Sequence, residues 1–263
     1  MKIKITSLIL LAFLSTSCCD TGCSTITVGK NIPITEVPLE QASTPMQELI
    51  KRGKAAVDSI KAPIIGTAAT TLKAERPESS LTNFAADALL AQSRIYSKEN
   101  IDLAITNKGG LRSDLHEGVI TFGDVYNVFP FENTLVTLTL NGEQLLQLFN
   151  EIAKVGGEAI SGARMEIIRN SNSRHCAKLT IDNTTLPGND DEWKKREYRI
   201  ATSDYLSQGN DGLVTLAQGS NRKEYTVTIR QLMIDYIANL HKQDKAVDAA
   251  TDGRIKIIDT DKR

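Results

Sequence analysis

The stretch IDLAITNKGGLR, residues 101–112, places a short apolar run directly before a polar turn that contains two glycines. The run Ile101–Thr106 predicts a strand, because aliphatic residues dominate it and a turn ends it. In the turn 107–110 the two glycines let backbone N–H groups approach a ligand, and Arg112 adds a planar cationic group. The stretch predicts a strand that ends at a candidate binding turn, although a plain surface turn with an exposed arginine fits it as well.

Helices and strands alternate on both sides of this predicted strand. Further strands are predicted by alternating or short apolar runs at residues 64–68, 133–140, 163–168, 177–181, 198–202 and 254–258. Helices are predicted from residue 46 to about 60, after a cap at Ser79 or Ser80, at 143–154 and near 227–241. Several strands are joined by short turns, so the sequence predicts one α/β or α+β domain, residues 46–258, with a mixed sheet flanked by helices.

Composition narrows the classes of function. The 263 residues are 41% hydrophobic and 24% charged with a formal net charge of -1, which is typical of a globular protein and gives no attraction for a nucleic-acid polymer. The chain has three histidines, His116, His175 and His241, and they are scattered. Dinuclear metal hydrolases draw several imidazoles into one site, so we expect no metal site formed by this chain alone.

The N-terminus predicts export. Two lysines precede an apolar run at residues 5–14, and small residues then lead to Cys18. This pattern predicts a lipoprotein signal, residues 1–18, with lipidation at Cys18, or at the cysteine that follows it. The alternative is that the three cysteines within residues 18–23 are disulfide partners in an exported chain. Residues 19–45 are rich in threonine, serine and proline and predict a tether, so we expect a chain anchored to a bacterial membrane by lipid, periplasmic or surface-facing, with no transmembrane helix.

Two further segments are candidates for ligand binding. Phe129–Asn133, with the sequence FPFEN, holds two aromatic rings around a proline, and a ring on such a loop can present its face to a planar ligand. Residues 204–212, DYLSQGNDG, join Tyr205 to a turn that readily holds positive φ values and would leave Asp211 as an acceptor for vicinal hydroxyls. The alternatives are that both phenylalanines enter the core and that the second segment is a plain surface turn.

Five motifs occur in the order seen in a known family. They are residues 83–88 (NFAADA), 105–112 (ITNKGGLR), 121–135 (TFGDVYNVFPFENTL), 161–162 (SG) and 204–212 (DYLSQGNDG). Together they resemble the 5'-nucleotidase C-terminal domain family over about residues 46–258. Complete members of that family join this domain to an N-terminal metallophosphoesterase domain, which carries two metals and the catalytic histidines.

The resemblance implies a nucleoside pocket in this chain. Phe131 would stack on one face of a base and Tyr205, where the family usually has phenylalanine, on the other. Such a sandwich tolerates any base, because every base offers a π face. Asp211 would accept hydrogen bonds from ribose hydroxyls.

The remaining implied contacts are polar. Asn107 and Asn133 would bond the base or line the pocket. Arg112, and Arg76 in the stretch before the second helix, would face the substrate phosphate or ribose. No catalytic residue and no metal ligand is implied for this chain.

Several positions depart from the family pattern. Lys108, Glu132 and Asn210 stand where glycine is common, and Leu213 stands where an aromatic residue is usual. Asn210 is a mild change because asparagine tolerates left-handed conformations. Lys108 brings a side chain and a charge to the binding turn, so we expect it to affect base selectivity more than binding itself.

These features lead to one expected function and two alternatives. We expect the substrate-binding half of a split 5'-nucleotidase, with two divalent metals on a separate metallophosphoesterase chain and no turnover by this chain alone. The alternatives are a nucleoside-binding lipoprotein without a catalytic partner, and a vestigial interaction module whose pocket has decayed.

Overall fold

The computed structural model describes residues 43–182, 184–188 and 191–261. The predicted signal, most of the predicted tether and the predicted lipidation site Cys18 lie outside the described residues. Helix α2 (Thr44–Lys61) begins two residues before its predicted start, and none of its residues is buried. No helix among the described residues is long and apolar enough to cross a membrane.

A five-stranded mixed sheet forms the centre of the folded region. Its strand order is β10 (Ser220–Thr228), β4 (Thr134–Asn141), β9 (Glu197–Ser203), β2 (Leu103–Thr106) and β5 (Ala159–Ser161). Strand β2 runs parallel to β9, and the other neighbouring pairs are antiparallel. This arrangement confirms the predicted mixed sheet, and the strand in the 101–112 stretch lies inside it, between β9 and the edge strand β5.

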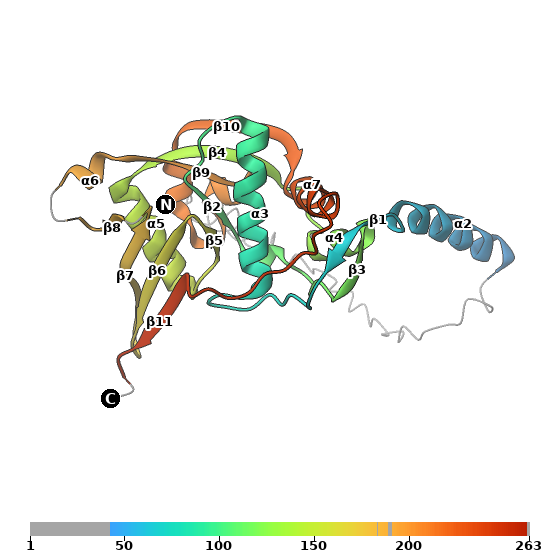
Figure 1. Cartoon of the computed structure of the whole chain (residues 1–263), viewed down its shortest axis with the longest axis horizontal. Helices are drawn as coiled ribbons and strands as arrows, with labels where there is room; N and C mark the ends of the chain where they lie inside the picture. Colours follow the sequence, from blue (N-terminus) through green and yellow to red (C-terminus); the bar gives the residue numbers. More distant parts are fainter. Residues whose placement is uncertain (1–42, 183, 189–190, 262–263) are drawn as a thin grey trace, which may run out of the picture. The chain divides into compact units, whose positions relative to one another are not determined.

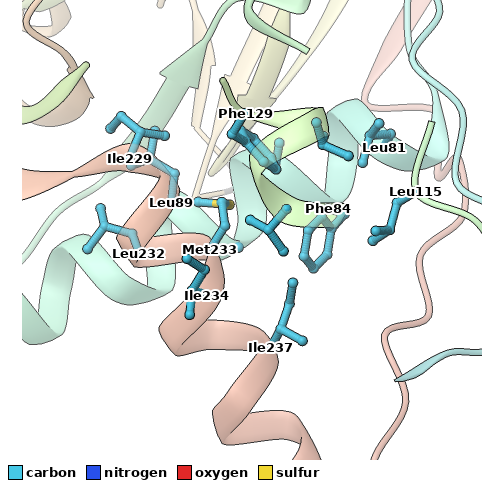
Figure 2. Packing of buried hydrophobic residues seen from close by; sticks show 14 of the residues in the cluster. Leu81, Phe84, Leu89, Leu115, Phe129, Ile229, Leu232, Met233, Ile234 and Ile237 are labelled. Carbon is cyan, nitrogen blue, oxygen red and sulfur yellow. The ribbon is translucent and has the colours of Figure 1, made fainter. Parts of the chain in front are cut away.

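Both faces of this sheet are buried, each in a different apolar cluster. Along β2, Leu103 and Ile105 belong to one cluster and Ala104 to the other, as expected when successive side chains point to opposite faces. The Ala104 face packs against α3 (Ser80–Ser97) and α7 (Ile229–His241), whose side chains interlock in Figure 2. The opposite cluster draws its side chains from α5 (Gly142–Val155) and a second sheet.

The second sheet has the order β11 (Ile255–Asp259), β6 (Ala163–Arg169), β7 (Arg174–Ile181) and β8 (Thr184–Leu186). Helix α5 contacts β7 of this sheet and also β4 and β9 of the five-stranded sheet, so it lies between the two sheets (Figure 1). The layers are therefore α3 with α7, the five-stranded sheet, α5 and the four-stranded sheet. This is the predicted α/β class with helices that flank sheet layers.

Gly162 connects the two sheets. It separates β5 in the first sheet from β6 in the second and has a φ of +85°. A Cβ at this position would lie 2.2 Å from the carbonyl oxygen of Asp102, so only glycine fits. The Ser161-Gly162 motif of the sequence is thus a backbone crossing point.

Shorter elements surround these layers. Strand β1 (Ile64–Ala68), with the bounds predicted for it, pairs with β3 (Gly118–Thr121), and α4 (Phe122–Val128) follows β3. A short helix, α6 (Glu192–Lys195), precedes β9. The chain also contains four short 3-10 helices among the described residues: η2 (Lys108–Gly110), η3 (Leu206–Gln208), η4 (Asn210–Gly212) and η5 (Val214–Gln218). Of the two predicted caps of α3, Ser79 and Ser80, the cap is Ser79, whose side chain accepts from the Thr82 N–H.

Candidate functional site

A pocket of about 330 Å³ opens at one end of the five-stranded sheet. It is lined by Asn107, Gly109, Gly110, Arg112, Phe131, Asn133, Tyr205 and Asp211. Six of the seven expected binding residues are therefore in one place, although they come from three segments spread over more than one hundred positions. The seventh, Arg76, is elsewhere.

Sheet topology explains why these segments meet. Asn107 follows the last residue of β2, and Tyr205 comes two residues after β9, which is parallel to β2. Asn133 directly precedes β4, which is antiparallel to β9. The carboxyl ends of β2 and β9 and the amino end of β4 therefore share one edge, where the connecting loops form a concave surface.

Asp211 lies at the centre of a hydrogen-bonded network. The Asn107 side-chain amide donates to Asp211 Oδ2 at 2.6 Å, and the Tyr205 hydroxyl donates to Asp211 Oδ1 at 2.8 Å. Asp211 has a φ of +56°, so a non-glycine residue takes the left-handed conformation here beside Gly209 and Gly212, whereas Asn210 does not. The carboxylate is thus exposed but not free, and the lone pairs left on both oxygens remain open to a ligand.

The Tyr205 hydroxyl is affected by this contact. The hydrogen bond to Asp211 raises the pKa of Tyr205 above its usual value, because removing the proton would place two negative charges together. Tyr205 therefore remains a neutral donor at physiological pH. The hydroxyl that distinguishes it from phenylalanine has a definite partner.

Asn107 is buried, whereas the aromatic residues of the pocket are not. Only 7% of Asn107 is exposed, against 47% of Phe131 and 39% of Tyr205. A Cβ at Gly110 would lie 2.8 Å from Asn107 Oδ1, so the amide occupies space that only glycine leaves. The buried amide lines one wall of the pocket, and the two rings leave large apolar surfaces open.

The two phenylalanines of the FPFEN segment point in different directions. Phe129 is buried in the cluster formed by α3 and α7 (Figure 2), whereas Phe131 lines the pocket with the Arg112 guanidinium 5.9 Å from its ring centre. The alternative that both rings enter the core is therefore wrong for Phe131. One ring anchors the loop, and the other is presented on it.

A buried arginine that the sequence did not single out holds this loop. Arg230 in the first turn of α7 donates to the carbonyl of Phe129 at 3.0 Å and forms an ion pair with Glu132. Its guanidinium lies 3.8 Å from the ring centre of Tyr126, a cation–π contact. The only signal in the sequence was an arginine at the second position of a predicted amphipathic helix.

Arg76 has a different position from the expected one. It does not line the pocket but donates to the carbonyl of Gly157 at 2.7 Å and pairs with Glu158. Glu158, also missed in the sequence, accepts a hydrogen bond from the Lys108 backbone N–H, at the start of the binding turn. Arg76 therefore contacts a residue that supports the pocket.

Glu158 is a carboxylate with competing influences on its ionisation. Burial raises its pKa, while the Lys108 N–H and the charge of Arg76 lower it and the nearby Asp211 raises it again. The net direction is upward. The carboxylate is kept in its buried position by two donors.

The described residues do not fit a dinuclear metal centre. Within residues 43–182, 184–188 and 191–261, no three histidine, cysteine, aspartate or glutamate side chains are grouped so that they could hold a metal ion. His116, His175 and His241 are all exposed. Cys176 is a buried free thiol whose pKa burial raises to about 11, which leaves it protonated.

Fold and site together define a class of protein: an α/β domain with a pocket of aromatic and polar side chains at the loop edge of a mixed sheet. The chain belongs to the 5'-nucleotidase C-terminal domain family, whose model matches residues 57–218.

Relatives in sequence and structure agree with this membership. The chain is 28% identical over 187 residues to the trifunctional nucleotide phosphoesterase protein YfkN of Bacillus subtilis (strain 168), covering 69% of this chain and 12% of YfkN. It is 28% identical over 159 residues to a probable 5'-nucleotidase of Treponema pallidum (strain Nichols), covering 55% and 26%. The crystal structure of a 5'-nucleotidase precursor from Thermus thermophilus aligns with a TM-score of 0.67 at 27% identity, covering 81% and 43%. The chain thus spans less than half of each relative.

Proposed function

We propose that this chain binds a nucleoside or nucleotide in the pocket and holds it for phosphate-ester hydrolysis by two divalent metals on a separate metallophosphoesterase chain. The observation that carries the proposal is the convergence of six expected side chains on one pocket. Its volume of about 330 Å³ is within the range of small-molecule sites. Family membership adds support, because two relatives are named a nucleotide phosphoesterase and a probable 5'-nucleotidase.

The aromatic residues would bind the base. Phe131 and Tyr205 line the same pocket and are both exposed, so a base inserted between them would bury apolar surface on each ring. Stacking on an aromatic side chain contributes about 1–3 kcal/mol per base. Because each base has a π face, we expect weak discrimination between purines and pyrimidines from these contacts alone.

The polar residues would bind the sugar and orient the base. Asp211 keeps lone pairs for ribose hydroxyls beside the bonds from Asn107 and Tyr205. Asn133, at the pocket wall, would bond the base edge. Arg112 lies at the Phe131 side, where its guanidinium would face phosphate oxygens.

The chemistry is divided between two chains in this proposal. Two metals would activate water on the partner, and the described residues of this chain form no such metal site. This chain would supply proximity and orientation, since a substrate fixed in the correct geometry reacts much faster than a free one.

The proposal includes export and a lipid anchor on Cys18, which would keep the chain and its substrate outside the cytoplasm. Labelling of cells with a radioactive fatty acid tests it. The wild-type chain is expected to carry the label and the Cys18→Ala variant to lose it, and an unlabelled wild-type chain rules the anchor out.

Calorimetry with adenosine and AMP, together with an AMP hydrolysis assay in divalent metal, tests the function. We expect binding by the purified chain without turnover, and turnover when a metallophosphoesterase partner is added. Phe131→Ala should weaken adenosine binding by about fivefold to 150-fold, from the stacking energy that is lost. Ile95→Ala, which truncates an exposed apolar residue on α3, is the matched control and should bind as the wild type does.

Three results would contradict parts of this proposal. Robust AMP hydrolysis by the isolated chain removes the need for a partner. Adenosine binding without any partner that restores turnover favours a nucleoside-binding lipoprotein. No binding, unchanged by Phe131→Ala or Asp211→Ala, favours a vestigial interaction module.

A further inference from the structure

The binding turn η2 begins in an unusual way. Asn107 occupies the position before its first residue, where an asparagine side chain normally accepts a hydrogen bond from an N–H of the turn. Here Asn107 makes no such bond. Its amide instead donates to Asp211 at 2.6 Å, so the side chain bonds a residue that lines the pocket and does not cap the turn.

Glu158 accepts the hydrogen bond from the turn that the Asn107 side chain does not accept. One of its carboxylate oxygens accepts from the Lys108 N–H, the first N–H of the turn, and the other accepts from Arg76. The Glu158 side chain is 1% exposed and lies fifty positions further along the chain, between α5 and β5. The turn is therefore held from outside by a buried charge, which is uncommon for a short surface turn.

Gly110 shows that the position of the Asn107 side chain is specific. Its Oδ1 lies where a Cβ of residue 110 would approach to 2.8 Å, and its Nδ2 faces Asp211. The amide is thus placed between Gly110 and Asp211. A small rotation of the turn would move it away from the carboxylate.

We propose that Glu158 is the positioning residue of the nucleoside pocket: by binding the Lys108 N–H it holds the turn, so that the Asn107 amide stays on Asp211 and in the pocket. This inference rests on the proposed function. Glu158 does not line the pocket, so it acts through Asn107 and contacts no ligand itself. Arg76 supplies its counter-charge, which gives that arginine an indirect role in binding.

Glu158→Gln tests the inference with little change in volume. The variant removes the negative charge and leaves one acceptor oxygen where the carboxylate has two, so the Lys108 N–H and Arg76 compete for it. We expect adenosine affinity to fall about tenfold, the effect of losing roughly one charge-assisted hydrogen bond. The melting temperature should stay close to that of the wild type, because removal of a buried charge relieves its desolvation.

Glu99→Gln is the matched control. Glu99 also pairs with arginine, at 2.8 Å from Arg199, and is largely buried, but its partners lie on the sheet and not at the pocket. This variant should bind adenosine as tightly as the wild type. Equal affinity for Glu158→Gln and Glu99→Gln would overturn the inference.

A second measurement needs no ligand. In the ligand-free chain, the side-chain amide protons of Asn107 should give a shifted and slowly exchanging NMR signal because they bond Asp211, and Glu158→Gln should abolish that signal while Glu99→Gln keeps it. An unchanged Asn107 signal in Glu158→Gln overturns the positioning role. If the wild type binds no nucleoside, the proposed function fails, and the Asn107 signal alone then decides whether Glu158 positions this side chain.

Discussion

Two walls of the pocket are each held by a buried ion pair: the Asn107 wall, which is the turn 107–110, and the Phe131 wall, which is the loop 129–133. The buried member of the pair is a carboxylate at the first wall and a guanidinium at the second. On the Asn107 wall, the Glu158 side chain is 1% exposed and pairs with Arg76, which is 40% exposed. On the Phe131 wall, the Arg230 side chain is 4% exposed and pairs with Glu132, which is 74% exposed. In each case a buried ion binds a loop, and its partner reaches solvent.

The walls differ in whether the buried ion can lose its charge when the pH changes. A carboxylate can accept a proton and become neutral, whereas a guanidinium keeps its charge throughout the physiological range. Arg230 also has the ring of Tyr126 and the carbonyl of Phe129 as permanent partners. The Phe131 wall is therefore fixed, and the Asn107 wall is open to titration.

Removing the fixed ion should have the largest effect. Arg230→Ala deletes the cation–π contact, the hydrogen bond to Phe129 and the volume of a buried side chain, and we expect it to lower the free energy of unfolding by about 2–4 kcal/mol. Chemical denaturation measures this change. Arg164→Ala, at an exposed ion pair with Asp252, is the control and should cost less than about 1 kcal/mol. Similar losses in both variants would show that Arg230 is not a structural anchor.

Two neighbouring glycines allow a finer test of the Asn107 wall. A Cβ at Gly110 would lie 2.8 Å from Asn107 Oδ1, which is too close for an ordinary contact. A Cβ at Gly109 would lie 3.6 Å from Asn107 Nδ2, which is an ordinary van der Waals distance. Neither glycine has a positive φ, so alanine is compatible with both backbones.

We therefore expect Gly110→Ala to displace the Asn107 amide and weaken adenosine binding about tenfold, as loss of one to two hydrogen bonds would. Gly109→Ala also adds a methyl group at the pocket but leaves the Asn107 amide in place, so its loss of affinity should be smaller. Calorimetry on the pair separates the two outcomes. Equal affinities would mean that the Asn107 position does not matter for the ligand.

The comparison also shows what the sequence could predict. The mixed sheet follows from the alternation of apolar runs, and the expected pocket residues from the resemblance to the family together with the turns after predicted strands. Strand β10 was not predicted, because most of its residues are exposed and polar and give no apolar pattern. Arg230 and Glu158 were missed for a different reason: their role depends on a partner that is about one hundred or fifty positions away, and no local spacing encodes that.

Arg76 illustrates the same limit. The resemblance to the family implied contact with the substrate phosphate or ribose, but its guanidinium pairs with Glu158 and donates to the carbonyl of Gly157. Only the three-dimensional contacts show whether it faces the ligand or the residue that supports the pocket.

The difference between the walls predicts a difference in pH dependence. Burial raises the pKa of Glu158, so this carboxyl begins to bind a proton at a higher pH than an ordinary glutamate as the solution is acidified. Protonation removes the charge that holds the Lys108 N–H, so nucleoside affinity should fall with falling pH. The stability effect has the opposite sign: a carboxyl whose pKa is raised by folding favours the native state below its unfolded pKa, and that contribution is lost as the pH rises through the folded pKa.

This difference can be tested by measuring adenosine affinity against pH in the variants Arg76→Ala and Glu132→Ala. Loss of Arg76 removes a charge that lowers the pKa of Glu158, so the acid-side fall in affinity should move to higher pH, with a loss of about threefold at pH 7. Loss of Glu132 leaves Arg230 charged, so the pH profile should keep its position even if the affinity changes. A shift in both variants, or in neither, would contradict the assignment of the titrating group to the Asn107 wall, because only that wall is held by a buried ion that can be neutralised.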